Sequence, residues 1–311
     1  MPTVAIENFA VCTGCEVAVL DLGDTLLSLL PQLDFVHVQV LMDHKWFGQK
    51  GEGKHLEIVP ADIGIVTGGI RTEEDRHIAL ELRKKVKVLI SLGACAVHGG
   101  VPALANLSTR EEMMEDVYGT HTTDKPTSLP SVNIPALEDR IYAVDEVVPV
   151  DVSIPGCPPH PDIIGSAVLS LLKGKPWYLP ARSVCDDCPT IREKKGAVPV
   201  RRPLQNPDRA PGAPLSQMRC LNEQGIICNG PVTKAGCGGE EVVPRCIKAN
   251  MPCRGCFGPI RGSSKPYVDM VNALVSNGID IKSIDDRLGT FNRYIGAQKR
   301  LRVHADREGT Q

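Results

Sequence analysis

The feature that most constrains this chain is a stretch of 72 residues, from Cys185 to Cys256, that holds eight of its twelve cysteines. The gaps between successive cysteines are 2, 31, 7, 8, 8, 6 and 2 residues, so the stretch opens and closes with a C-x2-C pair. Glycine and proline recur between the cysteines, which is typical of loops that wrap closely around a compact object. We therefore expect no ordinary apolar core here. The eight residues are Cys185, Cys188, Cys220, Cys228, Cys237, Cys246, Cys253 and Cys256.

Such a segment is either cross-linked by disulfides or binds metal through thiolates. The redox state of the protein's cellular compartment distinguishes the two possibilities. The first ten residues carry no basic region followed by an apolar run, and the chain has no stretch of 18 apolar residues. This pattern predicts a cytoplasmic protein with no membrane partner. Cytoplasmic thiols stay reduced, so clustered cysteines there favour metal binding. Twelve cysteines suffice for three four-thiolate centres.

Length and charge narrow the class of protein further. A chain of 311 residues exceeds the usual size of one domain, so two domains are expected. Residues 1–180 have a net charge of −10 and residues 181–311 one of +8. The basic charges are scattered and the chain has only five Phe, which argues against a nucleic-acid partner. We expect the cationic side chains to offset anionic metal–thiolate centres instead.

Strands and helices alternate in the first part of the chain. Apolar and β-branched runs predict strands over residues 4–9, 36–42, 62–67, 87–92 and 147–154, and amphipathic patterns predict helices over 16–30, from about 72, and over 162–173. Residues 102–140 are expected to be irregular. This alternation predicts an α/β domain over residues 1–176 with a flavodoxin-like parallel sheet.

The remainder, residues 177–311, is predicted to be an irregular, cysteine-rich domain with few helices. Residues 177–214 are rich in Pro and Arg and are interpreted as a connector. One helix is predicted over 266–277, and the C-terminal residues are basic and expected to be exposed.

The other four cysteines follow three of the predicted strands. Cys12 and Cys15 follow the first strand, Cys95 the fourth and Cys157 the fifth. Ligands of an open parallel sheet bind at the carboxyl ends of its strands, so these loops can meet and supply four thiolates to one centre. Glycines beside the cysteines would let the backbone approach a bulky cluster: Gly14, Gly93 and Gly156.

Spacing helps to choose the metal. The pairs Cys185/Cys188 and Cys253/Cys256 suit zinc, but the remaining four cysteines contain no C-x2-C pair, which is unusual for structural zinc. Iron–sulfur clusters accept wider and more irregular spacings. A zinc-rich scaffold without enzymatic function stays open on spacing alone.

Three motifs carry a resemblance to a known family. Cys12-Thr-Gly-Cys15, Gly93-Ala-Cys95 and Pro155-Gly-Cys157-Pro-Pro resemble the proximal-cluster motif of the small, electron-transferring subunit of nickel-iron hydrogenases, and the resemblance covers both predicted domains. It implies a proximal cluster on these four cysteines. For the C-terminal cysteines it implies two further sets, namely a medial cluster on Cys237, Cys246, Cys253 and Cys256 and a distal cluster on Cys185, Cys188, Cys220 and Cys228.

Two positions depart from the best-known periplasmic members of that family. Cys185 stands where a His is usual, and Cys246 stands where many members have a Pro and a three-iron medial cluster. The resemblance then implies three 4Fe-4S clusters. Because ligand and cluster type set reduction potential, we expect a low-potential chain.

Within the family the chain is most similar to the small (gamma) subunit of the methanogen methyl-viologen-reducing, deazaflavin-non-reducing hydrogenase. The resemblance implies an oxidoreductase subunit of methanogenesis with no catalytic residue of its own. Its expected partners are a large subunit that holds nickel, a small iron–sulfur (delta-type) subunit and heterodisulfide reductase. The alternatives are the small subunit of the deazaflavin-coenzyme-reducing hydrogenase and a relay subunit of another iron–sulfur oxidoreductase, such as the quinone-reductase relative.

Three further side chains near the cysteines have more than one interpretation. Glu16 follows Cys15 and could serve proton movement, but a helix-first-turn carboxylate is the simpler interpretation. His98 and His160 flank cluster loops and are expected to lie beside the ligands rather than among them.

Overall fold

The computed structural model describes residues 1–39, 42, 57–120, 132–193, 198–202, 205–262 and 264–301. The chain divides into two compact units, one of Met1–Leu169 with Tyr294–Gln311 and one of Ser170–Arg293. The sequence-based division between residues 176 and 177 differs from this one mainly at the C-terminus, which returns to the first unit. No helix within the described ranges combines the length and the apolar character needed to cross a bilayer.

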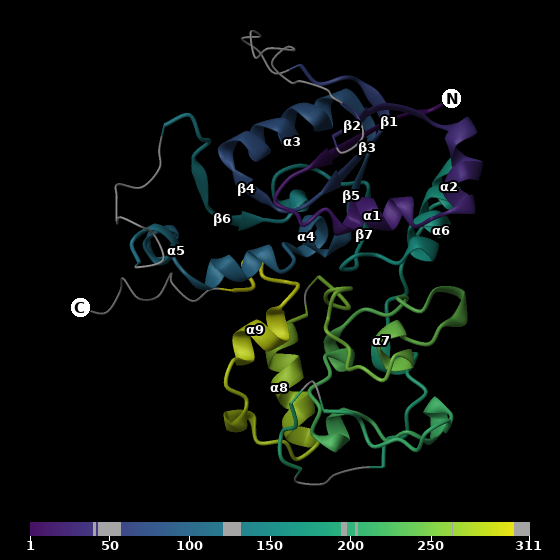
Figure 1. Ribbon diagram of the computed structural model, residues 1–311, viewed down its shortest axis with the longest axis vertical. Coiled ribbons are helices and arrows are strands. Elements are labelled where there is room, and N and C mark those ends of the chain that lie inside the picture. The colour runs from purple at the N-terminus through teal and green to yellow at the C-terminus, as the bar shows by residue number, and fades with distance from the viewer. Residues whose placement is uncertain are drawn as a thin grey trace. The chain divides into compact units, whose positions relative to one another are not determined.

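The first unit is built on a five-stranded parallel sheet (Figure 1). Its strand order is β2-β1-β3-β5-β7, which is the doubly wound order of flavodoxin-like sheets and confirms the predicted parallel α/β architecture. The strands are β1 (Thr3–Asn8), β2 (Asp34–Val38), β3 (Ala61–Thr67), β5 (Val86–Leu92) and β7 (Val152–Ile154). In register, Ile65 lies between Ile6 and Ile90.

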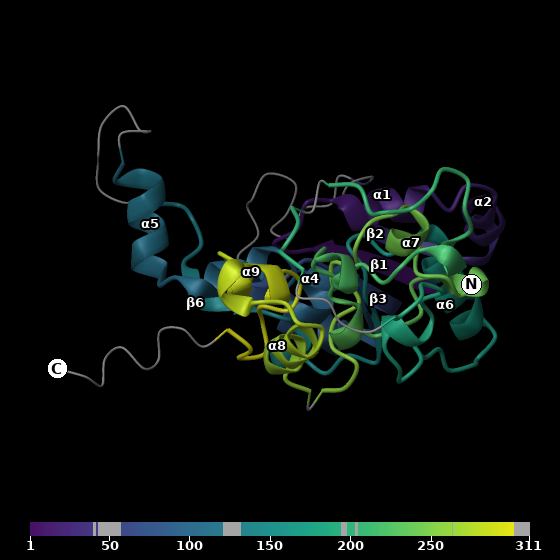
Figure 2. The same ribbon diagram turned by 90° about the horizontal axis from the view of Figure 1, so that it is seen from below.

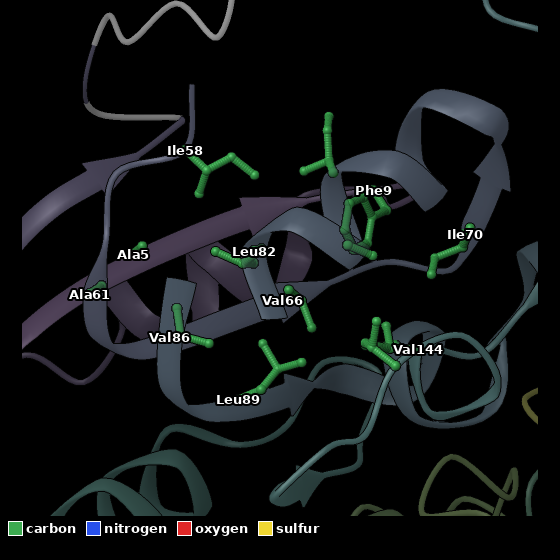
Figure 3. Close-up of a cluster of buried hydrophobic side chains, with 14 residues drawn as sticks. Ala5, Phe9, Ile58, Ala61, Val66, Ile70, Leu82, Val86, Leu89 and Val144 are labelled. Carbon is green, nitrogen blue, oxygen red and sulfur yellow. The ribbon is translucent and has the colours of Figure 1, made fainter. Parts of the chain in front are cut away.

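Helices cover both faces of this sheet. Helix α3 (Glu73–Lys85) begins at a capping box on Thr72 and buries Ile78, Ala79 and Leu82 against one face. Figure 3 shows Leu82 among Ala5, Val66 and Val86, which come from three neighbouring strands. The opposite face carries α1 (Gly14–Leu20) and α2 (Asp24–Leu29), while α4 (Gly93–His98) and α6 (Pro161–Leu172) follow β5 and β7.

Two predicted elements of this unit are shorter than the sequence pattern suggests. The predicted helix over 16–30 is broken into α1 and α2, because Gly23 adopts a φ of +56° between them. The predicted strand over 147–154 is confined to Val152–Ile154, since Pro149 has no N–H and the Asp151 carboxylate accepts the Leu89 N–H at 2.7 Å. The predicted strand over 36–42 ends at Val38, and its residues 40 and 41 lie outside the described ranges.

The segment 102–140 contains regular structure that its polar composition does not suggest. Strand β6 (Leu137–Tyr142) pairs antiparallel with β4 (Ile70–Thr72) in a separate two-stranded sheet. Helix α5 (Arg110–Tyr118) is closed by a capping box on Thr109, and Figure 2 shows it projecting beyond β6. The prediction of an irregular segment is therefore wrong for these elements, because capping and pairing stabilise them in place of an apolar stripe. Residues 121–131 of this segment lie outside the described ranges.

The second unit is mostly loops and short 3-10 turns, as its composition predicts. Its described helices are α7 (Arg245–Lys248), α8 (Pro266–Ser276) and α9 (Arg287–Asn292). Helix α8 confirms the helix predicted over 266–277, and it buries Met270 and Leu274. Another apolar cluster of this unit includes the side chains of Cys228 and Cys253 among Val184, Met218, Leu221, Ile226 and Ile247.

Apolar residues of the C-terminal segment 294–301 pack within the first unit, although its Lys299 and the preceding Arg293 are exposed, as expected of a basic tail. Ile295 forms a parallel bridge with Gly100, and the Ala297 N–H donates to the His98 carbonyl at 3.1 Å. Ala297 is fully buried with Ala103, Ile141 and Ala143. The apolar residues of this segment decide its position, and residues 302–311 lie outside the described ranges.

Candidate metal centres

Three segments at the carboxyl edge of the sheet carry Cys12, Cys15, Cys95 and Cys157, and Cys15 and Cys95 lie in the first turns of α1 and α4. The loop after β1 is held to the loop after β3 by the Ala10 N–H, which donates to the Gly69 carbonyl at 3.0 Å. The first turn of α4, which follows β5 directly, is held to the loop after β7 by the Ala94 N–H, which donates to the Gly156 carbonyl at 2.6 Å. The parallel topology thus brings together loops that lie far apart in the sequence, as the strand-end argument predicts.

Glycine makes the close approach of these loops feasible. A Cβ on Gly93, whose φ is +91°, would lie 2.3 Å from the Cys15 Sγ. A Cβ on Gly100, at φ +58°, would lie 2.5 Å from the Cys95 Sγ. Both positions need the positive φ that only glycine adopts at little cost, and both would place a methyl group where a sulfur lies.

The thiols of this set influence one another electrostatically. Burial, followed by the neighbouring charges of Cys157 and Cys12, raises the pKa of Cys95 to about 12. Burial also raises the pKa of Cys15, with further contributions from Glu16 and the other three cysteines. Cys15 and Cys95 are buried, whereas Cys12 and Cys157 are exposed. Four thiolates can share this site only if a cationic group compensates their repulsion, which is what a metal centre provides.

A second set of four thiols lies in the Ser170–Arg293 unit. A Cβ on Gly230 would lie 3.1 Å from the Cys185 Sγ and 3.6 Å from the Cys228 Sγ, so these two sulfurs flank one glycine. Burial is the main cause that raises the pKa of Cys185 to about 12, and the charges of Cys220 and Cys188 contribute to the rise. The buried Asn222 positions Cys228 by accepting its N–H at 2.8 Å and donating to its carbonyl at 2.9 Å.

The last four cysteines, predicted to form a third set, act on one another electrostatically in two pairs, Cys237 with Cys246 and Cys253 with Cys256. The Arg254 N–H donates to the Cys246 sulfur, and Arg254 itself lies between Cys253 and Cys256 in the chain. Burial raises the pKa of Cys237. The Arg245 N–H, which donates to the Cys237 sulfur, lowers this pKa, and the charge of Cys246 raises it. Cys246 lies on α7.

One hydrogen bond joins the second and third sets. The Cys253 N–H donates to the Cys228 Sγ at 3.2 Å, and the Asn229 N–H donates to the Cys253 carbonyl at 2.9 Å. The backbone of Cys253, in the third set, is therefore in direct contact with the sulfur of Cys228, in the second set.

The donor set of each group fits an iron–sulfur cluster. All twelve cysteines lie in the described ranges and carry thiols rather than disulfides. Within those ranges no three His, Cys, Asp or Glu side chains converge on the position of a single metal ion. Backbone N–H groups donate to cysteine sulfurs, for example those of Val101 to Cys95, Gly230 to Cys228 and Gly255 to Cys253. Such amide donors stabilise thiolates and are among the factors that tune iron–sulfur clusters.

Several residues at these sites have no signal in the sequence. Arg192 donates to the Cys185 carbonyl at 2.7 Å, and its charge lowers the Cys185 pKa against the larger effect of burial. The Thr190 hydroxyl lies 3.1 Å from the Cys188 Sγ. Residue type alone does not separate these side chains from ordinary surface residues, because their roles depend on loop conformation.

The side chain of Glu16, a residue of α1, is buried against the sheet rather than exposed to solvent. Only 8% of the residue is exposed, and its Oε1 accepts the Thr67 hydroxyl at 2.5 Å. It lines a largely apolar cavity of about 270 Å³ with Thr67, Ile6 and Leu92. Glu16 thus lies in the first turn of a helix as expected, but it is buried rather than exposed. His160, in contrast, is partly exposed and pairs with Asp162 at 3.3 Å, as expected of a residue outside the ligand set.

Comparison with known proteins places this chain among hydrogenase subunits. The family model described as "NADH ubiquinone oxidoreductase, 20 Kd subunit" matches residues 12–171. The chain is 38% identical over 283 residues to a subunit of the F420-non-reducing hydrogenase vhu of Methanocaldococcus jannaschii, with 91% of each chain covered. It is 32% identical over 297 residues to an iron-sulfur subunit of the F420-non-reducing hydrogenase of Archaeoglobus profundus, with 89% of this chain and 88% of that one covered.

A solved structure extends the comparison to the fold. A chain of an NAD+-reducing [NiFe]-hydrogenase in the H2-reduced state superposes with a TM-score of 0.52 and 26% identity, covering 58% of this chain and 95% of that one. The chain therefore belongs to the family described as NADH ubiquinone oxidoreductase, 20 Kd subunit, and within it to the hydrogenase subunits, which are components of an oxidoreductase.

Proposed function

We propose that this chain is the electron-transferring small subunit of a cytoplasmic nickel-iron hydrogenase. The observation that carries the proposal is twelve free cysteines in a chain related to hydrogenase subunits. The nickel site lies on another chain, the large subunit. Clustered free thiols are more usual in a reducing compartment, which supports a cytoplasmic location.

Each set of thiols is assigned to one 4Fe-4S cluster. Cys12, Cys15, Cys95 and Cys157 hold the proximal cluster, Cys237, Cys246, Cys253 and Cys256 the medial cluster, and Cys185, Cys188, Cys220 and Cys228 the distal cluster. When bound, each cluster supplies a one-electron carrier. The chain's own contribution is to hold the sulfurs in place, donate amide hydrogen bonds to them, and set positive side chains such as Arg192 and Arg254 beside them.

The large subunit is proposed to cover the face of the first unit where Cys12 is exposed. Helix α1, which follows Cys12 directly, presents Val17 and Leu20 to solvent with 51% and 49% exposure, and α2 presents Leu27 with 64%. Apolar side chains of this size, exposed on successive helices, are typical of an interface with another chain. An interface here would also shield the proximal site from water.

Electrons are proposed to leave through an iron–sulfur partner subunit of the delta type and then heterodisulfide reductase. Support comes from the methanogen relative, whose name describes it as F420-non-reducing, which favours an acceptor other than the deazaflavin coenzyme. Within the second unit, the Cys253 N–H on the Cys228 sulfur gives electrons a short path between the medial and distal sets.

Anaerobic purification of the complex from its native host tests the proposal. We expect about 12 iron and a matching amount of sulfide for this chain. A nickel-containing subunit should co-purify. Iron and sulfide without any nickel-containing partner would favour a relay subunit of another oxidoreductase, and zinc without sulfide would refute the cluster assignment. Reduction of the deazaflavin coenzyme by hydrogen would instead identify the deazaflavin-reducing enzyme.

A further inference from the structure

The last described residues of the chain, 294–301, are hydrogen-bonded to the end of helix α4, which carries Cys95. We call these residues the C-terminal strap. The strap follows the whole Ser170–Arg293 unit in the sequence, yet it belongs to the unit of the parallel sheet. Helix α4 has only six residues, and Cys95 is the third of them. A contact at the end of this helix therefore lies within one turn of a proposed cluster ligand.

The strap donates hydrogen bonds to the last two carbonyls of α4. The Ala297 N–H donates to the His98 carbonyl at 3.1 Å, and the side-chain amide of Gln298 donates to the Val97 carbonyl at 3.3 Å. The last carbonyls of a helix have no partner within the helix and need donors from elsewhere, above all when they are buried. The strap supplies these donors, so it completes the end of α4.

The strap also holds the turn that lies against the Cys95 sulfur. Ile295 forms a parallel bridge with Gly100, and a Cβ on Gly100 would lie 2.5 Å from the Cys95 Sγ. Gly99, which precedes it, donates its N–H to the Cys95 carbonyl at 2.9 Å. The strap thus contacts both segments that surround Cys95, namely the helix end and the turn after it.

The fit between the strap and this turn is close on both sides. A Cβ on Gly99 would lie 2.6 Å from the Ala297 Cβ, and a Cβ on Gly296 would lie 2.5 Å from the Ala103 carbonyl oxygen. Ala297 is fully buried in an apolar cluster with Ala103. Packing at this density leaves no room for a larger side chain, so a larger residue at position 297 must displace the strap.

Gln298 anchors the strap to a further segment. Its backbone N–H donates to the Glu146 Oε2 at 2.9 Å, and its side-chain amide donates to the Asp145 carboxylate at 2.8 Å. The amide has two protons, so one can serve Asp145 while the other serves the Val97 carbonyl. Gln298 has a φ of +58°, a conformation that is costly for a residue other than glycine and persists only where its surroundings fix it.

We propose that the C-terminal strap is a positioning element for the proximal cluster, in which Ala297 and Gln298 fix the end of α4 and thereby hold Cys95 beside the other three thiols. The inference rests on the proposed function, because it requires a cluster on these thiols. The strap contains no cysteine and acts through α4 and its turn. Because it follows the second unit in the chain, the proximal site is completed only after residues 170–293 have been synthesised.

The first test is Ala297→Leu in the anaerobically purified complex. Leucine puts a larger side chain against Gly99 and Ala103 and should displace the strap. We expect the iron of this chain to fall from about 12 to about 8. Iodoacetamide should then label the proximal thiols while the remaining cysteines stay protected, and peptide mass spectrometry identifies the labelled set. Limited proteolysis checks that the parallel sheet stays folded.

Lys299→Leu is the matched control for this variant. It places the same side chain on an exposed residue of the strap. We expect it to keep the iron content and the protected thiols of the parent complex. A loss of proximal iron in Lys299→Leu equal to that in Ala297→Leu would overturn the inference, because the loss would not depend on the contact with α4.

A second pair of variants tests the hydrogen bonds without crowding the core. Gln298→Glu keeps the size of the side chain but puts a carboxylate oxygen where the amide donated to Asp145 and to the Val97 carbonyl. We expect an iron chelator to remove the proximal iron about tenfold faster, with the rate for the other two clusters unchanged. Adding Asp145→Asn restores a donor opposite the new carboxylate and should return the rate towards that of the parent.

Full iron and protected proximal thiols in Ala297→Leu, with parent chelation rates in Gln298→Glu, would overturn the inference and leave the proposed function intact. If protease shows that the sheet of Ala297→Leu has unfolded, the chelation rates of the Gln298 variants decide, and rates equal to that of the parent would refute the role of the strap. Absence of iron and sulfide from the parent complex would refute the proposed function itself, before any variant is compared.

Discussion

Gly93 offers a direct test of the proximal site, because a single methyl group there would meet a ligand sulfur. In Gly93→Ala the new Cβ would lie 2.3 Å from the Cys15 Sγ, where ordinary contacts are about 3.5–4 Å. The sulfur or the loop must therefore move by more than about 1 Å. Metal–ligand distances tolerate only about 0.2 Å, so Cys15 would no longer hold the cluster with its three partners.

The cost in stability should be much smaller than the cost in metal binding. An alanine at the observed φ of +91° is strained by about 1–2 kcal/mol, which a folded domain generally survives. We therefore expect a folded chain whose iron content falls from about 12 to about 8, and a complex in which hydrogen no longer reduces the remaining clusters. The measurements are iron and sulfide analysis and electron paramagnetic resonance after exposure to hydrogen.

Gly174→Ala is the matched control for backbone strain. Gly174 has a similar left-handed backbone, with φ +65°, but a Cβ on it would meet no atom within 4 Å. This variant should show a comparable loss of stability and keep its iron and its reduction by hydrogen. A Gly93→Ala complex with full iron and normal reduction by hydrogen would refute the placement of Gly93 against a ligand sulfur.

Three further predictions concern the other clusters, the partner surface and the metal itself. Cys246→Pro should remove one iron and produce a three-iron signal in electron paramagnetic resonance while the other two clusters stay intact, and an unchanged spectrum would exclude Cys246 as a ligand. Leu27→Asp places a charge on the exposed apolar face of α2 and should lower the yield of co-purified nickel subunit at least tenfold, while this chain keeps its iron. The control is Leu80→Asp on α3, a leucine with 41% exposure, and this variant should keep the nickel subunit. Equal loss of the nickel subunit in both variants would argue against the proposed interface. Chelation of iron should make the Ser170–Arg293 unit sensitive to protease before the unit with the parallel sheet. The Cys228 and Cys253 side chains form part of the apolar cluster of the Ser170–Arg293 unit, whereas the sheet has an apolar core of its own. Simultaneous cleavage of both units would contradict this prediction.

The pattern of apolar residues was sufficient to predict much of the first unit. The runs at 62–67 and 87–92 predicted β3 and β5 to within one residue, because strands covered on both faces need continuous apolar side chains. The split between α1 and α2 was missed because an amphipathic pattern continues across Gly23, whose backbone conformation is a property of the folded chain. Strand β6 and helix α5 were missed because pairing with β4 and local capping, rather than an apolar stripe, form them.

The sequence by itself determined which atoms are available for the proposed centres: twelve thiols, with glycines beside those that follow strand ends, and almost no regular structure between Cys185 and Cys256. Tertiary structure decided which of these atoms come together. Two examples join residues that share no sequence period: the proximity of Cys185 and Cys228 to Gly230, and the hydrogen bond from the Cys253 N–H to the Cys228 sulfur. The physical reason is that irregular loops are positioned by hydrogen bonds and close packing between distant segments, which no local pattern encodes.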